Sequence, residues 1–380
     1  MDCKYTVYTR REVLELMAKA GAGVGASAVA LQAFGWFIPE ADAADSVPMR
    51  KAMFQTKLDK GLVRCDLCPR NITIKPGNMC FCRTRKNING ELYALGFNSP
   101  CLINFDPIER GPIYHFLPGT QSMTMATAGC NMNCQYCQNY ELAQTSPDKA
   151  KRIDFNVPEA CRKGRMKSIT LTYTEPAVQP EYLIEISKTA KAYKLPVVVC
   201  TAGYINPEPL KALIPHVDAF AVTLKAATDE GYVKLTEVHM DPVLETIKNI
   251  RKSGKWLEIV TLVVEGYNDG RDDIRRIARW IRDNAGTDVP WHLSRFTPGY
   301  KLKKLPPTQR KTLEEARAEG LAQGLKYVYI TNLAPHDGNH TYCPKCKDKV
   351  IERLAFKTTG FNLKDGRCGT CGEKIPGVWR

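Results

Sequence analysis

The sequence has no internal repeats, which excludes an architecture stacked from one repeated unit. It is also poor in acidic residues, with 40 Asp and Glu against 54 Lys and Arg and a formal net charge of +14. The first 43 residues hold four basic and five acidic side chains, so the rest of the chain carries +15. At 380 residues the chain is long enough for one large domain with small appended modules.

A fourth cysteine is missing beside the densest cysteine motif. Cys130, Cys134 and Cys137 follow the spacing C-x3-C-x2-C. Three thiolates at this spacing can hold three irons of a [4Fe–4S] cube and leave the fourth iron without a protein ligand. An electron-transfer cluster normally uses four cysteines, so the open iron predicts that a small molecule completes the site. The alternative is a set of structural or zinc-binding cysteines, although no fourth zinc ligand lies nearby.

The chain around and after this motif alternates short apolar runs with amphipathic stretches. The predicted strands are 122–127, 168–173, 196–201, 219–224, 257–264, 290–295 and 326–331. The predicted helices are 180–193, 207–214, 242–253, 272–284 and 308–324. This order indicates an α/β fold with a parallel sheet, arranged as a partial (β/α)6 TIM-like barrel. We expect catalytic groups at the C-terminal ends of its strands.

The cysteine motif and its setting resemble the radical S-adenosylmethionine (SAM) superfamily. Tyr136, just before the last cysteine, stands where that superfamily places an aromatic residue beside the adenine. The resemblance implies a [4Fe–4S] cluster whose open iron is chelated by the amino and carboxylate groups of SAM. It further implies an external electron donor, because an electron from the reduced cluster cleaves SAM to a 5′-deoxyadenosyl radical that abstracts hydrogen from a substrate.

The end of the second predicted strand carries Thr174 and Glu175. These two residues resemble the Gly-Gly-Glu element of the superfamily, which implies that Glu175 accepts hydrogen bonds from the SAM ammonium group. An ordinary exposed loop glutamate is the alternative.

Two further strand ends resemble those of related activating enzymes. Thr201 opens Thr-Ala-Gly where the relatives carry Thr-Asn-Gly, so Ala202 lacks an amide. Lys225 closes Thr-Leu-Lys where the relatives carry Asp-Leu-Lys, and the resemblance implies that its ammonium group meets the SAM carboxylate. Thr223 departs from that pattern, which leaves its role open.

A narrower resemblance covers nearly everything from Cys65 to Trp379. The stretches Asp-Pro-Ile-Glu at 106–109, Tyr-His-Phe-Leu-Pro-Gly at 114–119 and Ile-Pro-Gly-Val-Trp at 375–379 are similar to radical SAM enzymes of the AmmeMemoRadiSam system. That family is related to the activases of pyruvate formate-lyase and other glycyl-radical enzymes. The substrate stays open: a protein glycine, another protein side chain or a small molecule. An iron–sulfur electron carrier without SAM chemistry and a zinc-ribbon binding protein on an inactive barrel are the alternatives from other classes.

Two smaller cysteine groups flank the predicted barrel. Near the C-terminus two C-x2-C pairs predict a zinc ribbon, with an auxiliary iron–sulfur cluster or disulfides as alternatives; they are Cys343, Cys346, Cys368 and Cys371. Near the N-terminus a second group suggests zinc, with structural or disulfide-bonded cysteines as the alternative; it consists of Cys65, Cys68, Cys80 and Cys82. The related family usually has a third cysteine where Ile72 stands. Four others are expected to be unligated: Cys3, Cys101, Cys161 and Cys200.

The first residues predict export. Arg10 and Arg11 form a twin-arginine pattern, a weakly apolar run covers 18–38, and Ala-Asp-Ala at 41–43 resembles a signal-peptidase site. An amphipathic helix with accidental arginines is the alternative. We therefore expect the protein in the periplasm or on the outer face of the cell membrane. Membrane association through an uncleaved leader stays open.

These signals divide the chain into four parts. A twin-arginine segment (1–43) precedes an N-terminal cysteine module (44–105), the barrel (106–335) and a C-terminal zinc-ribbon-like module (336–380). The basic excess concentrates in the N-terminal cysteine module. Nucleic acid is an improbable partner for an exported protein, so a solvated basic face, an acidic protein substrate or an anionic membrane surface accounts better for the charge.

Overall fold

The computed structural model describes residues 49–164 and 166–379, which belong to one compact unit. The predicted twin-arginine segment and Cys3 therefore lie outside the described residues. No helix among the described residues is both long and apolar enough to cross a bilayer.

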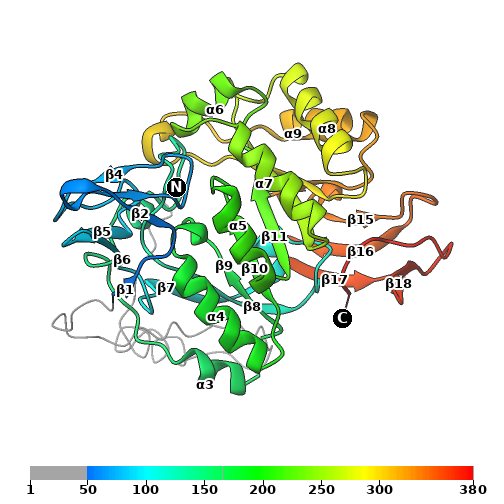
Figure 1. Ribbon diagram of the computed structural model, residues 1–380. Coiled ribbons are helices and arrows are strands. Elements are labelled where there is room, and N and C mark those ends of the chain that lie inside the picture. The colour runs from blue at the N-terminus through cyan, green and yellow to red at the C-terminus, as the bar shows by residue number, and fades with distance from the viewer. Residues whose placement is uncertain (1–48, 165, 380) are drawn as a thin grey trace, which may run out of the picture. The chain divides into compact units, whose positions relative to one another are not determined.

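A central eight-stranded sheet organises the described chain, in the order β14-β13-β12-β11-β10-β9-β8-β7 (Figure 1). Neighbouring strands from β8 to β14 pair in parallel, and β7 pairs antiparallel with β8. The strands are β7 (Leu102–Pro107), β8 (Gln121–Ala126), β9 (Ser168–Leu171), β10 (Val197–Thr201), β11 (Ala219–Thr223), β12 (Trp256–Val263), β13 (Trp291–Arg295) and β14 (Val328–Thr331). The α/β fold with a parallel sheet is thus confirmed. The added edge strand β7 was not predicted, and it crosses the boundary expected at 105/106.

Helices connect the parallel strands, and α4, α5 and α7 lie over β9, β10 and β11 in Figure 1. The α-helices of the described residues are α2 (Tyr140–Ala143), α3 (Val157–Arg162), α4 (Pro180–Ala192), α5 (Pro207–Leu213), α6 (Asp229–Thr236), α7 (Asp241–Lys252), α8 (Arg271–Asn284) and α9 (Arg310–Ala322). In α8 the buried residues recur at helical spacing, namely Ile274, Ile277, Ala278 and Ile281. Such periodicity explains why the long helices were predicted to within about two residues, whereas the short α2, α3 and α6 were missed.

The two flanking modules are built from short antiparallel strands. The N-terminal cysteine module holds two three-stranded sheets, formed by β1 (Arg50–Lys51), β2 (Gln55–Lys57), β3 (Val63–Cys65), β4 (Thr73–Ile74), β5 (Arg85–Ile88) and β6 (Glu91–Ala94). The C-terminal module contains β15 (Thr341–Tyr342), β16 (Lys349–Leu354), β17 (Lys357–Phe361), β18 (Leu363–Lys364) and β19 (Arg367–Cys368). Such small modules bury little apolar surface, so cross-linking thiols would matter for their stability.

Residues 108–118, called the plug segment below, lie against the inner face of the sheet. The apolar side chains of the plug segment form a cluster with Val198 and Ala219 near the beginnings of β10 and β11 and with Val260 in the middle of β12. Glu258 in β12 accepts hydrogen bonds from the backbone N–H groups of Tyr114 and His115 at 2.8–3.0 Å. The plug segment therefore occupies the N-terminal ends of these strands and leaves the opposite ends for chemistry.

Candidate active site

The three motif cysteines lie directly after β8, in the segment 127–139, called the cluster loop below. The Met132 N–H points at Cys130 Sγ at 3.4 Å, and the Cys137 N–H donates to the Cys134 carbonyl at 3.1 Å. Burial raises the pKa of all three thiols, that of Cys137 to about 11. Without a metal these cysteines would be neutral thiols at pH 7, and coordination would supply the energy of deprotonation.

The spacing of the sulfur atoms tests which metal group fits each cysteine set. Among the described residues, one cysteine group brings all its ligand atoms within 4.8 Å of one another, and it is the C-terminal group. Cys130, Cys134 and Cys137 do not form such a group in the described chain, and three thiolates that each bind a different iron of a cube need not approach one another that closely.

Glu175 follows β9 and is buried, with 1% of its surface exposed. Its Oε1 accepts from Thr201 Oγ1 at 2.6 Å and the Ala177 N–H at 3.0 Å, and its Oε2 accepts from the Ala202 N–H at 2.7 Å. Burial raises the pKa of Glu175, while these hydrogen bonds oppose the rise. The exposed-loop alternative is therefore wrong. Ala202 still contributes its backbone N–H although it lacks an amide side chain.

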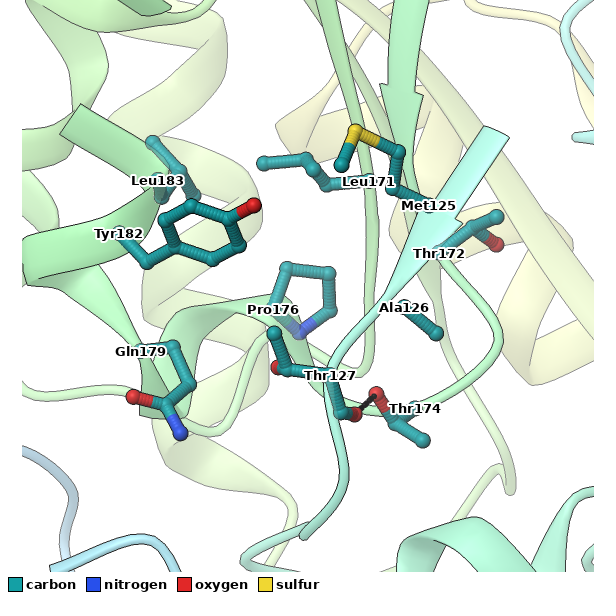
Figure 2. A pocket seen from close by; sticks show the side chains of 10 residues that line it. All are labelled: Met125, Ala126, Thr127, Leu171, Thr172, Thr174, Pro176, Gln179, Tyr182 and Leu183. Carbon is teal, nitrogen blue, oxygen red and sulfur yellow. Dashed lines mark hydrogen bonds between the residues drawn. The ribbon is translucent and has the colours of Figure 1, made fainter. Parts of the chain in front are cut away.

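The segment 172–179, called the β9–α4 loop below, is tied to the cluster loop. Thr174 Oγ1 donates to the Thr127 carbonyl at 2.6 Å, as the dashed line in Figure 2 shows. Asn139 Nδ2 donates to the Tyr173 carbonyl at 2.8 Å, and Tyr173 has a left-handed φ of 69°. Strain of this kind is concentrated at functional sites. Neither this contact of Asn139 nor the backbone conformation of Tyr173 was predicted from the sequence.

Lys225, at the end of β11, lies close to the cluster loop. Its Nζ is 5.7 Å from the centre of the Tyr136 ring. Burial alone would lower the pKa of Lys225, but the nearby Cys134 and other thiols raise it above its usual value. The buried Tyr136 hydroxyl has no hydrogen-bond partner within the described chain. A cation, a carboxylate and an unsatisfied hydroxyl thus gather beside the three cysteines, an arrangement that fits a zwitterionic ligand with a polar ring.

A small cavity lies beside the β9–α4 loop, between the ends of β8 and β9 and the start of α4 (Figure 2). Its volume of about 20 Å³ suits one water molecule. The side chains of Gln179 and Tyr182 line it, and their buried polar atoms lack hydrogen-bond partners within the described chain. A water molecule in the cavity would provide hydrogen-bond partners for these atoms. At this volume the cavity is too small to be the substrate site.

The four C-terminal cysteines converge. Sulfur–sulfur distances are 3.5 Å between Cys343 and Cys371 and 3.7 Å between Cys346 and Cys368. Tetrahedral zinc with Zn–S bonds of about 2.3 Å requires sulfurs roughly 3.8 Å apart. The arrangement therefore fits one tetrahedral ion better than an iron–sulfur cube, and these distances exclude disulfide bonds in this structure.

The N-terminal cysteines converge only in part. The Cys80 thiol hydrogen-bonds those of Cys65 and Cys82, and these contacts lower the pKa of Cys65 and lower that of Cys82 to about 6. Cys68 packs with the core of the barrel, and burial raises its pKa to about 11, with further increases from the nearby Cys82 and Cys65. Cys101, Cys161 and Cys200 lie apart from every other thiol in the described chain, with no cysteine among the groups that shift their pKa.

Known proteins share this sequence pattern. A family model described as the Radical SAM superfamily matches residues 125–281. An uncharacterized protein of Methanocaldococcus jannaschii, MJ0808, is 44% identical over 332 residues, covering 86% of this chain and 99% of the relative. The pyruvate formate-lyase-activating enzyme of Clostridium pasteurianum is 26% identical over 210 residues, 49% of this chain and 86% of that enzyme. The crystal structure of Streptococcus suis SuiB bound to S-adenosylmethionine matches with a TM-score of 0.44 and 12% identity, covering 60% of this chain and 53% of that one.

Proposed function

The chain belongs to the radical SAM superfamily and is an enzyme that cleaves SAM reductively; on that premise we propose that it acts on a partner protein. Cys130, Cys134 and Cys137 would hold a [4Fe–4S] cluster, which when reduced would supply the one electron needed to split SAM into methionine and a 5′-deoxyadenosyl radical. Transfer of a hydrogen atom from the substrate to that radical would give 5′-deoxyadenosine and a substrate radical.

The residues of the site divide this work. We assign Cys130, Cys134 and Cys137 as the cluster ligands. Glu175 Oε2 accepts one protein hydrogen bond and keeps acceptor capacity for the SAM ammonium group. Lys225 would pair with the SAM carboxylate.

The remaining predicted contacts act at the edges of the ligand. Tyr136 would lie beside the adenine, where a ligand atom could satisfy its hydroxyl. Thr174 and Thr201 act as positioning residues, because their hydroxyls donate to Thr127 and Glu175 rather than into the site.

The similarity to activating enzymes carries the proposal of a protein substrate. The pyruvate formate-lyase-activating enzymes of Clostridium pasteurianum and Escherichia coli match over 86% and 88% of their lengths. A protein glycine is therefore the favoured hydrogen donor, ahead of a small molecule. We also propose that the enzyme is part of an AmmeMemoRadiSam system. That name refers to genes of partner families found together in genomes and does not specify a reaction.

The cleavage reaction is tested anaerobically. Protein reconstituted with iron and sulfide is reduced with dithionite and given SAM, and 5′-deoxyadenosine is quantified. We expect Cys134→Ala to abolish product and Cys161→Ala to retain it, because Cys161 is a buried cysteine outside the site. Equal yields from the two variants would contradict the assignment of Cys134.

The substrate class is tested with isotopes. Cells of the source organism are grown on deuterated glycine, and their macromolecular fraction and ultrafiltrate are offered separately to the enzyme. Deuterium in 5′-deoxyadenosine from the macromolecular fraction alone supports a protein glycine. Deuterium from the ultrafiltrate alone would replace it with a small molecule.

We propose that the C-terminal cysteines bind one Zn²⁺. The test is metal analysis of a variant with Cys130, Cys134 and Cys137 all changed to Ala. We expect one zinc per chain to remain there and to be lost on adding Cys371→Ser. Iron retained in its place would overturn the zinc assignment.

The N-terminal group is a second candidate zinc site, supported by the contacts among Cys65, Cys80 and Cys82. If it binds an ion, Cys65→Ser lowers the zinc content by one per chain without affecting the C-terminal site. An unchanged zinc content would identify these cysteines as structural.

We further propose that residues 1–43 direct twin-arginine export. A reporter that folds before export, fused after residue 43, should reach the periplasm and stay in the cytoplasm when Arg10 and Arg11 are both changed to Lys. If all of the reporter stays in the cytoplasm at its uncleaved mass, the export proposal is wrong. The same fractionation, with a carbonate wash, separates a released protein from one retained by an uncleaved leader.

A further inference from the structure

The N-terminal cysteine module contacts the cluster loop immediately after its first cysteine. Arg70 Nε donates to the carbonyl of Asn131 at 2.8 Å, and Arg70 Nη2 donates to the Glu237 carbonyl at 3.2 Å. The guanidinium group stacks on Phe81, 3.8 Å from the ring centre. Arg70 follows Cys68 by two residues, and Phe81 lies between Cys80 and Cys82. The peptide next to Cys130 is therefore held by residues that belong to the N-terminal cysteine pairs.

The same module presses on the backbone just before that cysteine. Gly129 has a φ of 98°, and a Cβ placed there would lie 2.3 Å from Thr84 Cγ2 and 2.6 Å from the Cys82 carbonyl oxygen. Only glycine tolerates both this conformation and this approach. The backbone on both sides of Cys130 is thus fixed from one module.

The module also contacts the β9–α4 loop and the helix that follows it. The Thr84 hydroxyl donates to the Val178 carbonyl at 3.2 Å, and it lies 3.1 Å from Cys82 Sγ. Arg85 forms a fully buried ion pair of 2.9 Å with Glu181 in α4. Thr84 therefore contacts both Gly129, beside the cluster ligand, and Val178, beside Glu175. One displacement of residues 80–85 would shift both halves of the site.

We propose that the N-terminal cysteine module positions the radical cluster, with Arg70 and Thr84 setting the orientation of Cys130. The proposal rests on the assignment of Cys130 as a cluster ligand. Groups that orient metal ligands typically change metal affinity or activity 10- to 100-fold when removed. The proposal gives the N-terminal cysteines a purpose beyond local stability, because their integrity fixes the residues that hold the cluster loop.

The direct test compares two arginines of the same module. Arg70→Met keeps a long apolar side chain beside Phe81 but removes the guanidinium donors, whereas Arg64→Met alters an exposed arginine that pairs with Asp66. After anaerobic reconstitution, cluster loss to a chelator is followed optically, and the reduced cluster is examined by electron paramagnetic resonance with and without SAM. We expect about tenfold faster loss and a changed spectrum for Arg70→Met. Arg64→Met should match the wild type, and Arg70→Lys should restore part of the protection.

A second comparison tests the cysteines themselves. Cys82→Ser and Cys346→Ser each remove one thiol from a flanking group, and only the first should change the cluster spectrum and its midpoint potential. Wild-type spectra and chelation rates in both Arg70→Met and Cys82→Ser would overturn the positioning role while leaving the proposed function intact. Wild-type protein that assembles no [4Fe–4S] cluster would instead remove the proposed function. If Arg70→Met fails to fold, the Arg70→Lys and Cys82→Ser results decide the question.

Discussion

Glu258 and His292 lie on the neighbouring parallel strands β12 and β13, with 2.6 Å between Glu258 Oε2 and His292 Nε2 and both side chains fully buried. Glu258 also accepts from Trp256 Nε1 and from the backbone of the plug segment. One carboxylate therefore ties two strands to the segment that fills the barrel below the active site.

We expect Glu258→Leu to destabilise the fold by about 3–5 kcal/mol, because it leaves several buried donors without an acceptor. Glu258→Gln should cost less, since its amide oxygen still accepts. Chemical denaturation checks both, with Glu245→Leu on the exposed face of α7 as the matched control. Equal losses in the free energy of unfolding for Glu258→Leu and Glu245→Leu would contradict the anchoring role of Glu258.

His115 predicts a pH dependence of stability. Burial lowers the pKa of His115 to about 4, below its usual value of 6.5. As the pH falls, the unfolded chain therefore takes up the proton before the folded protein does. This contribution to the stability of the fold is then fully present above pH 6.5 and decreases as the pH falls toward 4, because protonation favours the unfolded state. A shift of this size corresponds to roughly 3 kcal/mol.

The variant His115→Asn keeps a donor for the Pro376 carbonyl, which lies 2.7 Å from His115 Nδ1, and removes the titrating ring. Its stability should vary less between pH 6.5 and pH 4 than that of the wild type, as measured by denaturation at each pH. His239→Asn, at an exposed histidine, should leave the profile unchanged. If the stability of His115→Asn changed with pH as much as that of the wild type, the prediction would be contradicted.

Glu175 should determine SAM affinity more than cluster content. We expect Glu175→Gln to retain the iron of the wild type but to weaken SAM binding by roughly tenfold or more, since a charge-assisted hydrogen bond contributes about 1.5–3 kcal/mol. Iron analysis and SAM titration of the reduced cluster separate the two effects.

Thr201→Val provides the comparison for Glu175, because it removes one donor to Glu175 and keeps the carboxylate. It should weaken SAM binding less than Glu175→Gln does. Loss of iron in Glu175→Gln would show that the carboxylate supports the cluster loop itself.

Local patterns predicted much of this architecture. The strands of the parallel sheet are continuous apolar runs, and long helices such as α8 carry buried residues at regular spacing, so both can be recognised in the sequence. The cysteine loop after β8 was placed by the same reasoning. Its chemistry follows from three cysteines that are close in the sequence.

Contacts between distant residues could not be predicted in the same way. Glu258 sits inside an apolar strand, and its partners at Tyr114 and His115 lie more than 140 residues away. Arg70 is an ordinary basic residue in the sequence, and its contact with Asn131 exists only because the N-terminal cysteine module folds onto the cluster loop. The convergence of Cys65, Cys80 and Cys82 likewise depends on how that module packs.

The C-terminal module should stabilise the barrel through its metal site. The side chain of Arg353 donates to the Tyr114 carbonyl at 2.8 Å, Thr358 donates to Glu109 at 2.6 Å, and the Val378 N–H donates to the His115 carbonyl at 2.7 Å. These contacts hold the plug segment in addition to those made by Glu258. Since binding energy at a structural metal site is folding energy, removing the ion should loosen the plug as well as the module.

We therefore expect Cys371→Ser to lower the midpoint of thermal unfolding of the whole barrel, followed by circular dichroism of its helices, by several degrees. Chelation of the wild type should reproduce the shift, and excess zinc should reverse it. Cys161→Ser is the matched control, because Cys161 lies in α3 and no other cysteine is among the groups that shift its pKa. If the C-terminal module of Cys371→Ser unfolded separately while the barrel helices unfolded at the wild-type temperature, the contacts of Arg353 and Thr358 would not couple the module to the barrel.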